Sequence, residues 1–132
     1  MRILSLAAIL ATLAAPLAAQ SRPGLPNEPE ITEGLITVGM AYELSERCDG
    51  LKARTLTGIT TLLGLKNRAR GLGYSSAEVD AFIDDDAEKD RLEAIARERL
   101  RGLGVVEDQP QSFCAVGRDQ IARGTGVGRL LR

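Results

Sequence analysis

The stretch EITEGLITVGMAYELSERC, residues 30–48, decides the fold class of this 132-residue chain. At roughly 100° per residue, its apolar side chains fall into two stripes on nearly opposite sides of a helix. The first stripe consists of Ile31, Leu35, Val38 and Tyr42, and the second of Ile36, Met40 and Leu44. This spacing predicts a helix from about Glu30 to Cys48. A helix that is apolar on two sides is either central in its domain or covered by a second chain.

The rest of the chain continues the helical pattern. No proline occurs between Pro29 and Pro110, and the intervening segment is rich in Ala, Leu, Glu and Arg. Apolar spacing predicts further helices over about 51–70, 76–84, 86–101 and 111–123, followed by a short turn that holds Leu130 and Leu131. The wide apolar arc of the helix over 51–70 predicts that it is central and buried. We therefore expect an all-α fold, a compact bundle of about five helices.

Two kinds of local signal mark the helix ends. Residues 75–78, SSAE, fit a capping box at a helix start. The segments Arg68–Gly73 and Arg99–Gly104 echo each other at an offset of 31 residues, and each contains Gly-Leu-Gly. The echo has two interpretations, a two-unit helical repeat or a shared helix-stop chemistry in which the leucine folds back onto the core. We favour the helix stop, because two units are fewer than a stable repeat array needs.

The first residues have the features of an export signal. Arg2 precedes an apolar run from Ile3 to Ala15, and small residues follow as a cleavage site, which is typical of a secretory signal peptide. We expect a signal peptide over 1–19, an extended proline-rich arm over 20–30 and a helical domain over 31–132. The expected location is the periplasm, with no membrane attachment after the leader is removed.

Export determines how the two cysteines are interpreted. In an oxidising compartment an even pair predicts one structural disulfide, Cys48–Cys114, because the chain has no Cys-x-x-Cys motif. The bond would close a loop long enough to contribute roughly 4 kcal/mol in the chain-entropy treatment.

The composition argues against several classes of function. The chain contains no histidine, which excludes Ser-His-Asp and Cys-His nucleophiles and histidine metal ligands. With 17 basic and 18 acidic residues, it has no basic excess for nucleic acid. Asp84, Asp85 and Asp86 could hold a cation, but they lack a calcium-loop pattern and suit a helix start. We expect no catalytic residues, no metal and no cofactor, and no enzymatic activity.

One pair of cations stands apart from the others. Lys66 and Arg70 project from the apolar side of the predicted helix over 51–70, which makes them a possible anion site or ion-pair site. We favour ion pairing, with Glu43 or Glu46 as the candidate partner.

Several short motifs resemble those of a domain-of-unknown-function family of small exported helical proteins in alphaproteobacteria. They are PEI at 29–31, GL at 34–35, GLKNRAR at 64–70, LGYS at 72–75, FC at 113–114, GR at 117–118 and Ile121. The resemblance implies export, a helical structure and the cysteine pair. It implies no activity and no binding residues.

These observations predict a non-catalytic periplasmic protein that binds a protein partner or itself. Ile36, Met40 and Leu44 are the possible interface, because a small domain has difficulty burying two stripes of one helix. The alternatives are a small-ligand or anion-binding protein that uses Lys66 and Arg70, and an acid-stress chaperone.

Overall fold

A computed structural model describes residues 22–132, so the predicted signal peptide over 1–19 lies outside the described residues. The described chain forms one 3₁₀ turn and six α-helices. They are η1 (Leu25–Asn27), α1 (Pro29–Arg47), α2 (Thr55–Gly71), α3 (Ser76–Ile83), α4 (Asp86–Gly102), α5 (Pro110–Ala122) and α6 (Gly126–Arg129). The prediction of an all-α fold is confirmed.

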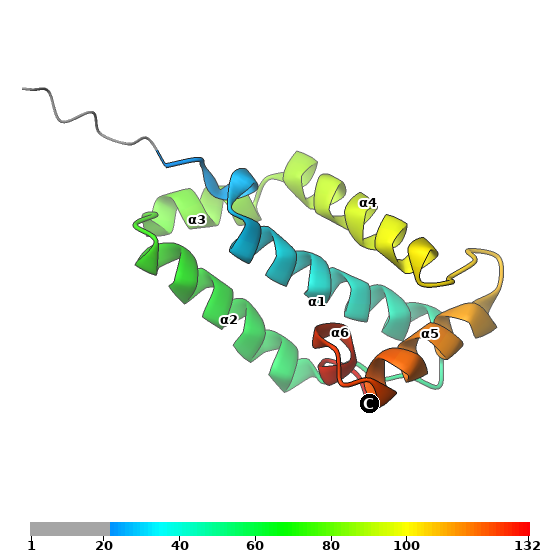
Figure 1. Ribbon diagram of the computed structural model, residues 1–132. Coiled ribbons are helices and arrows are strands. Elements are labelled where there is room, and N and C mark those ends of the chain that lie inside the picture. Colours follow the sequence, from blue (N-terminus) through cyan, green and yellow to red (C-terminus); the bar gives the residue numbers. More distant parts are fainter. Residues whose placement is uncertain (1–21) are drawn as a thin grey trace, which may run out of the picture.

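The helices are arranged around α1 (Figure 1). α2 and α4 run along opposite sides of α1, and α3 connects them at the end where α1 begins. α5 and α6 pack together and against α1 at its other end. The first predicted helix is therefore central, which is one of the two outcomes that its two apolar stripes allowed.

Local chemistry places most helix boundaries. Pro29 and Pro110 begin α1 and α5, where the missing amide proton costs no hydrogen bond. The predicted capping box is confirmed at α3, because the Ser75 hydroxyl accepts from the Glu78 amide and the Glu78 carboxylate accepts from the Ser75 amide. Asp85 caps α4 in the same way by accepting from the Glu88 amide at 3.1 Å.

The start of α2 was predicted four residues too early. Residues 52–54 are extended instead, and they pair with the end of the chain: the Lys52 amide donates to the Arg132 carbonyl, and the Arg54 amide to the Leu130 carbonyl, each at 2.8 Å. Ala53 and Leu131, which pair here, are 78 residues apart in sequence. Such a tertiary contact cannot be predicted from helical spacing.

The two Gly-Leu-Gly segments end α2 and α4 with the same geometry. Gly73 and Gly104 adopt positive φ of 96° and 112°, which non-glycine residues avoid. The amides of the following residues, Tyr74 and Val105, donate back to carbonyls five residues earlier. These two side chains are buried, whereas Leu103 is 42% exposed. The helix stop is confirmed: the residue after each stop is buried, and of the two leucines Leu72 packs against the core whereas Leu103 does not.

Of the predicted extended arm over 20–30, residues 20 and 21 lie outside the described residues, and residues 22–30 are in part folded. Leu25 starts the 3₁₀ turn and is buried, and α1 already begins at Pro29. The Arg22 guanidinium lies over the Tyr74 ring at 4.7 Å. The arm was predicted to be extended because of its prolines, but Leu25 has an apolar site to fill on the domain.

The larger core lies on the second stripe of α1. Ile36, Met40 and Leu44 are 2%, 6% and 0% exposed, and α4, α5 and α6 contribute the side chains around them. The prediction that these three residues form an interface between chains is wrong. A single chain covers this stripe because α5 and α6 fold back over it.

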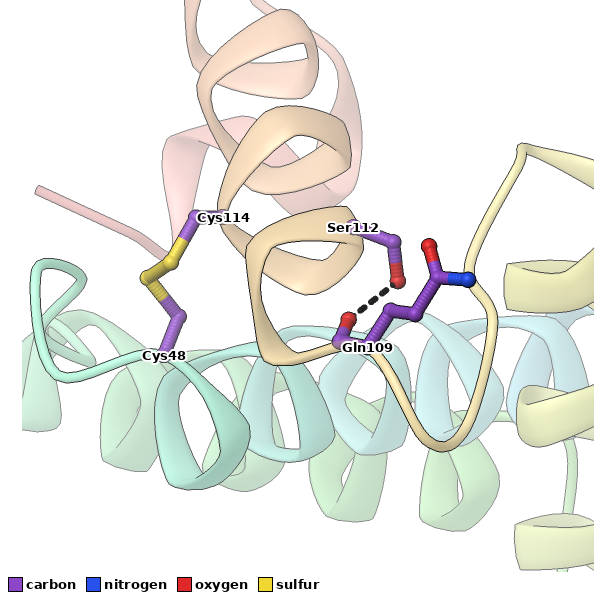
Figure 2. The surroundings of a disulfide bond; sticks show 4 residues. All are labelled: Cys48, Gln109, Ser112 and Cys114. Carbon is purple, nitrogen blue, oxygen red and sulfur yellow. Dashed lines mark hydrogen bonds between the residues drawn. A yellow bond between two sulfur atoms is a disulfide. The ribbon is translucent and has the colours of Figure 1, made fainter.

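The predicted disulfide is present in the structure and belongs to this core. Cys48 follows the last residue of α1, and Cys114 lies in the first turns of α5 with a Cα–Cα distance of 5.3 Å (Figure 2). Ser112 and Gln109 lie close by, where the Ser112 hydroxyl donates to the Gln109 carbonyl at 2.7 Å. The bond thus attaches the end of α1 to the start of α5.

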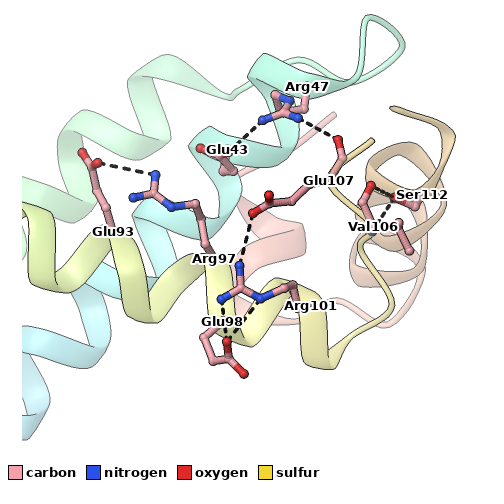
Figure 3. A network of polar contacts seen from close by, with 9 residues as sticks. All are labelled: Glu43, Arg47, Glu93, Arg97, Glu98, Arg101, Val106, Glu107 and Ser112. Carbon is pink, nitrogen blue, oxygen red and sulfur yellow. Dashed lines mark hydrogen bonds and ion pairs between the residues drawn. The ribbon is translucent and has the colours of Figure 1, made fainter. Parts of the chain in front are cut away.

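Ionic contacts surround the same end of the molecule (Figure 3). Arg101 of α4 binds the carboxylates of Glu98 and Glu107, and Arg47 of α1 donates to the Glu107 carbonyl at 2.9 Å. The Arg47 guanidinium also lies over the Phe113 ring at 4.7 Å. These contacts hold the loop between α4 and α5 against α1.

A second, smaller core lies at the other end of α1. It consists of Leu25, Ile31, Ala69, Tyr74 and Val79, with Leu35, Leu72 and Phe82 packed against it. The Tyr74 hydroxyl donates to the Glu28 carboxylate at 2.7 Å. This core joins η1, α1, the end of α2 and α3.

Candidate binding groove

An open apolar groove lies between α2 and α4, and it is the candidate functional site. Two adjoining cavities of about 330 and 520 Å³ form it. They share Leu35 of α1, Leu62 of α2, and Phe82 and Ile83 of α3. We call this combined hollow the groove. Such a volume is in the range of pockets that hold ligands.

The first stripe of α1 forms the floor of the groove. Ile31, Leu35, Val38 and Tyr42 all line it, and Gly39 lies between them. Their exposure increases along the helix, from buried Ile31 to Tyr42 at 60%. The two stripes of α1 therefore have the reverse of their predicted roles: the second is core, and the first borders the open surface.

The α2 wall of the groove consists of exposed aliphatic side chains. Ile59, Leu62 and Leu63 line it at 49%, 42% and 55% exposure, and Leu56 above them is 76% exposed. Each of these side chains still has on the order of 1 kcal/mol to gain from burial. The prediction that α2 is a buried central helix is wrong, because Ala69 is its one buried residue.

α2 contacts α1 on the side of its less exposed residues. Its less exposed positions include Thr57, Thr61, Leu65 and Ala69, which recur every four residues. Leu65 lies against Gly34 of α1, where a Cβ atom would come within 2.5 Å of a Leu65 methyl group. Close approach at Gly34 lets Leu65 pack on α1, while Leu62 and Leu63 line the groove and Leu56 is exposed.

The α4 wall is more polar. Leu92 lines the groove together with Glu88, Lys89 and Glu93. α4 is held to α1 by Arg99, whose guanidinium binds both carboxylate oxygens of Glu33, one of them at 2.7 Å. Hydrogen bonding from Arg99 holds the pKa of Glu33 below its usual range, and desolvation opposes this shift. The wall is thus fixed to the floor by a paired charge.

The candidate anion site does not form as predicted. The Lys66 ammonium lines the groove but binds the Asp80 carboxylate of α3 at 2.9 Å. Arg70 is exposed and lines neither cavity of the groove. Ion pairing of Lys66 is confirmed, although the partner is Asp80 and not Glu43 or Glu46. Glu43 pairs with Arg47 instead, one turn along α1.

Two of the acidic residues at the start of α4 have structural partners. Asp85 caps the helix, and the Glu88 carboxylate binds Arg91 at 2.8 Å. Within residues 22–132, no group of three potential ligands is arranged to hold a metal ion. Over the same residues, no helix combines the length and apolar character that crossing a membrane requires.

The sequence identifies the apolar stripe that forms the floor of the groove, but it predicts that the α2 wall is buried. The signal was present in α2, where the small residues Thr57, Thr61 and Ala69 lie in a row of every fourth residue on its less exposed side and Leu56, Leu62 and Leu63 lie outside that row. A core helix normally turns its largest apolar side chains inward, so small residues on the packed side indicate an apolar side left open.

Comparison with known proteins places the chain in a family. A family described as a family of unknown function, DUF5333, matches residues 23–132. No curated protein and no solved structure matches the chain. The family match covers η1 and every helix of the described chain, so the chain belongs to the DUF5333 family.

Proposed function

We propose that the chain is a non-catalytic periplasmic binding protein whose groove takes the apolar face of a helix from a protein partner. The observation that carries this proposal is the groove itself, with its exposed leucines and isoleucine on α2. Of the nine large apolar side chains that are exposed in residues 22–132, five line the groove and Leu56 borders it. A concentration of this kind marks a binding surface.

The shape of the groove supports a helix as the bound element. α1 forms a floor between two walls, α2 and α4, which run beside it (Figure 1). A fourth helix laid over α1 between these walls would complete a bundle, with apolar contacts from α1 and α2 and mixed contacts from α4. Amphipathic helices bind grooves of this kind through side chains spaced three and four residues apart.

The chemistry of the groove supports binding over catalysis. Its charged lining residues are Lys66, Lys89, Glu88 and Glu93. Lys66 is paired with Asp80, Glu88 with Arg91 and Glu93 with Arg97, so three of the four already form ion pairs within the chain. The chain has no histidine to supply a general base near neutral pH. The proposed periplasmic location follows from the predicted leader, and the disulfide is compatible with it.

Photo-crosslinking in cells tests this proposal. A photoreactive side chain is placed at Leu62, inside the groove, or at Leu103, which has the same 42% exposure but lies outside the groove. We expect discrete adducts with a helical segment of a protein from position 62 and none from position 103. Equal crosslinking from the two positions, or adducts with lipid or small molecules alone, would contradict the proposal.

A further inference from the structure

We infer that the helix that fills the groove is α2 of a second copy of this chain, so that two copies form a symmetric dimer with exchanged α2 ridges. This inference rests on the proposed function and names its partner. It is supported by an apolar ridge on α2, by the complementary charges around the groove and by the burial of both ridge and groove in one association.

α2 presents an apolar ridge suited to a groove. Leu56, Ile59 and Leu63 lie within roughly 60° of one another on the helix and are exposed by 76%, 49% and 55%. No charged residue occurs from Thr55 to Leu65, a length of about 16 Å. The ridge is therefore an exposed helix surface of the kind that the groove accepts, carried by the same chain.

The charges of the two walls are complementary. The segment from Leu51 to Ala77, which contains α2, has no acidic residue and carries Lys52, Arg54, Lys66, Arg68 and Arg70. The segment from Glu78 to Glu93, which contains α3 and the first half of α4, carries eight acidic residues and only Lys89 and Arg91 as cations; the acids are Glu78, Asp80, Asp84, Asp85, Asp86, Glu88, Asp90 and Glu93.

Within one chain the charges of α2 and α4 are kept apart, because these two helices lie on opposite sides of α1 (Figure 1), whereas α3 contacts α2. Lys66 reaches Asp80, but Arg68 pairs with Glu30 of α1. In a two-fold dimer, α2 of each copy enters the groove beside the second copy's α4. The basic residues at the two ends of the uncharged ridge of each copy then lie near the acidic segment of the other copy, so the two-fold symmetry makes this attraction occur twice.

A second copy also covers more than a foreign helix would. A single helix laid in the groove covers the floor and the inner side of α2, but it leaves the outermost side chain, Leu56, in water. Mutual insertion buries the ridge and the groove of both copies in one association. Two-fold symmetric interfaces have this property, because the same surface patch of each copy forms the contact.

The oligomeric state of the chain without its leader, with the disulfide intact, tests the inference. We expect a dimer by sedimentation velocity across the micromolar range, weakened by high salt. Leu56→Glu places a charge on the outermost ridge position, where the monomer fold does not depend on it, and is expected to weaken dimerisation by about tenfold or more. Leu103→Glu is the matched control and should remain dimeric with an unchanged circular dichroism spectrum.

The geometry is tested by placing a photoreactive side chain at position 63 in place of Leu63. This protein is then mixed with an isotopically labelled copy of the chain. Adducts between the two copies should map to the segment 82–92, which contains Phe82, Ile83 and Leu92 of the groove. A strict monomer, a Leu56→Glu variant that dimerises as well as the parent, or adducts outside the groove would overturn the inference. If the chain is monomeric but position 62 crosslinks to another protein in cells, only the dimer inference is overturned. If the chain is monomeric and position 62 crosslinks to no protein, the proposed function is overturned as well.

Discussion

α2 and α4 form the most informative comparison in this molecule. Both helices are 17 residues long, both lie beside α1, and both end in the same Gly-Leu-Gly stop. Ten residues of α4 are charged, whereas α2 has three charged residues and none before Lys66. Nevertheless, α4 buries Ala96 and Leu100 in the main core, and α2 buries only Ala69. The more apolar helix is the less buried one.

The difference shows that composition does not determine burial. α4 turns a few apolar side chains toward α1 and keeps its charges on the outside, where several pair across turns. α2 turns Leu65 and Ala69 toward α1 and leaves Leu56, Leu62 and Leu63 exposed. Because exposed leucines gain little in a monomer, we take their placement on α2 as a mark of association and not of folding.

The largest expected effect comes from the bond that closes the loop containing both helices. Replacing Cys48 and Cys114 together by Ala should lower the free energy of unfolding by about 4 kcal/mol. The reason is that the unfolded chain regains the entropy of an open loop. Urea denaturation of oxidised parent and variant measures the loss, and hydrogen exchange should show α2 amides opening before those of α4. Equal stability of the two proteins would show that the bond has no structural role.

The next prediction applies one substitution to both helices. Leu100→Ala in α4 removes a side chain that is 1% exposed and should cost roughly 3 kcal/mol, because it leaves a cavity in the core. Leu63→Ala in α2 should change the stability of the monomer by less than about 0.5 kcal/mol. Thermal and urea unfolding at low protein concentration measure both. Similar losses at the two sites would remove the distinction between the helices.

Substitution of the glycine that ends each helix should have the same effect at α2 and α4, although the two helices differ in burial. Gly73→Ala and Gly104→Ala each force a Cβ atom into a positive-φ conformation and should cost about 1 to 2 kcal/mol. Gly71→Ala and Gly102→Ala are matched controls at helical positions with open space around the added methyl group. A cost at Gly104 alone would mean that the two stops are not equivalent.

The smallest effect concerns the ion pair that fixes α4 to α1. Because Arg99 lowers the pKa of Glu33, the pair stabilises the fold above the ordinary carboxyl pKa near 4.5, and this contribution disappears as the pH falls through the lowered value. Glu33→Gln should cost about 0.5 kcal/mol near neutral pH and flatten the acid loss of stability. Denaturant titrations at neutral and acidic pH compare it with Glu46→Gln on the exposed side of α1. Parallel pH profiles for the two variants would contradict this assignment.

The existence and the ends of most helices could be predicted from the sequence because the signals are local. Proline at 29 and 110, the capping box at Ser75 and the glycines at 73 and 104 each act within one turn of the chain. The start of α2 could not be predicted, because it depends on pairing between residues 52–54 and 130–132. The disulfide was predicted correctly because two cysteines allow one pairing.

The candidate site was only half predictable. Periodicity correctly divides the apolar residues of α1 into two stripes, but it cannot say which stripe meets α5 and α6 and which borders water. The interface was therefore assigned to Ile36, Met40 and Leu44, and the structure places the open surface over Leu35, Val38 and Tyr42. Nothing in the spacing of α1 alone distinguishes these two outcomes.

The sequence by itself thus determined the helices, their caps and the cysteine pair, because each depends on residues close together or on a pairing without alternatives. Only the tertiary structure decided which side of α1 is core and that α2 stands with its leucines exposed. The physical reason is that burial is a property of contacts between distant segments: the return of α5 and α6 over one stripe leaves the other as the floor of an open groove.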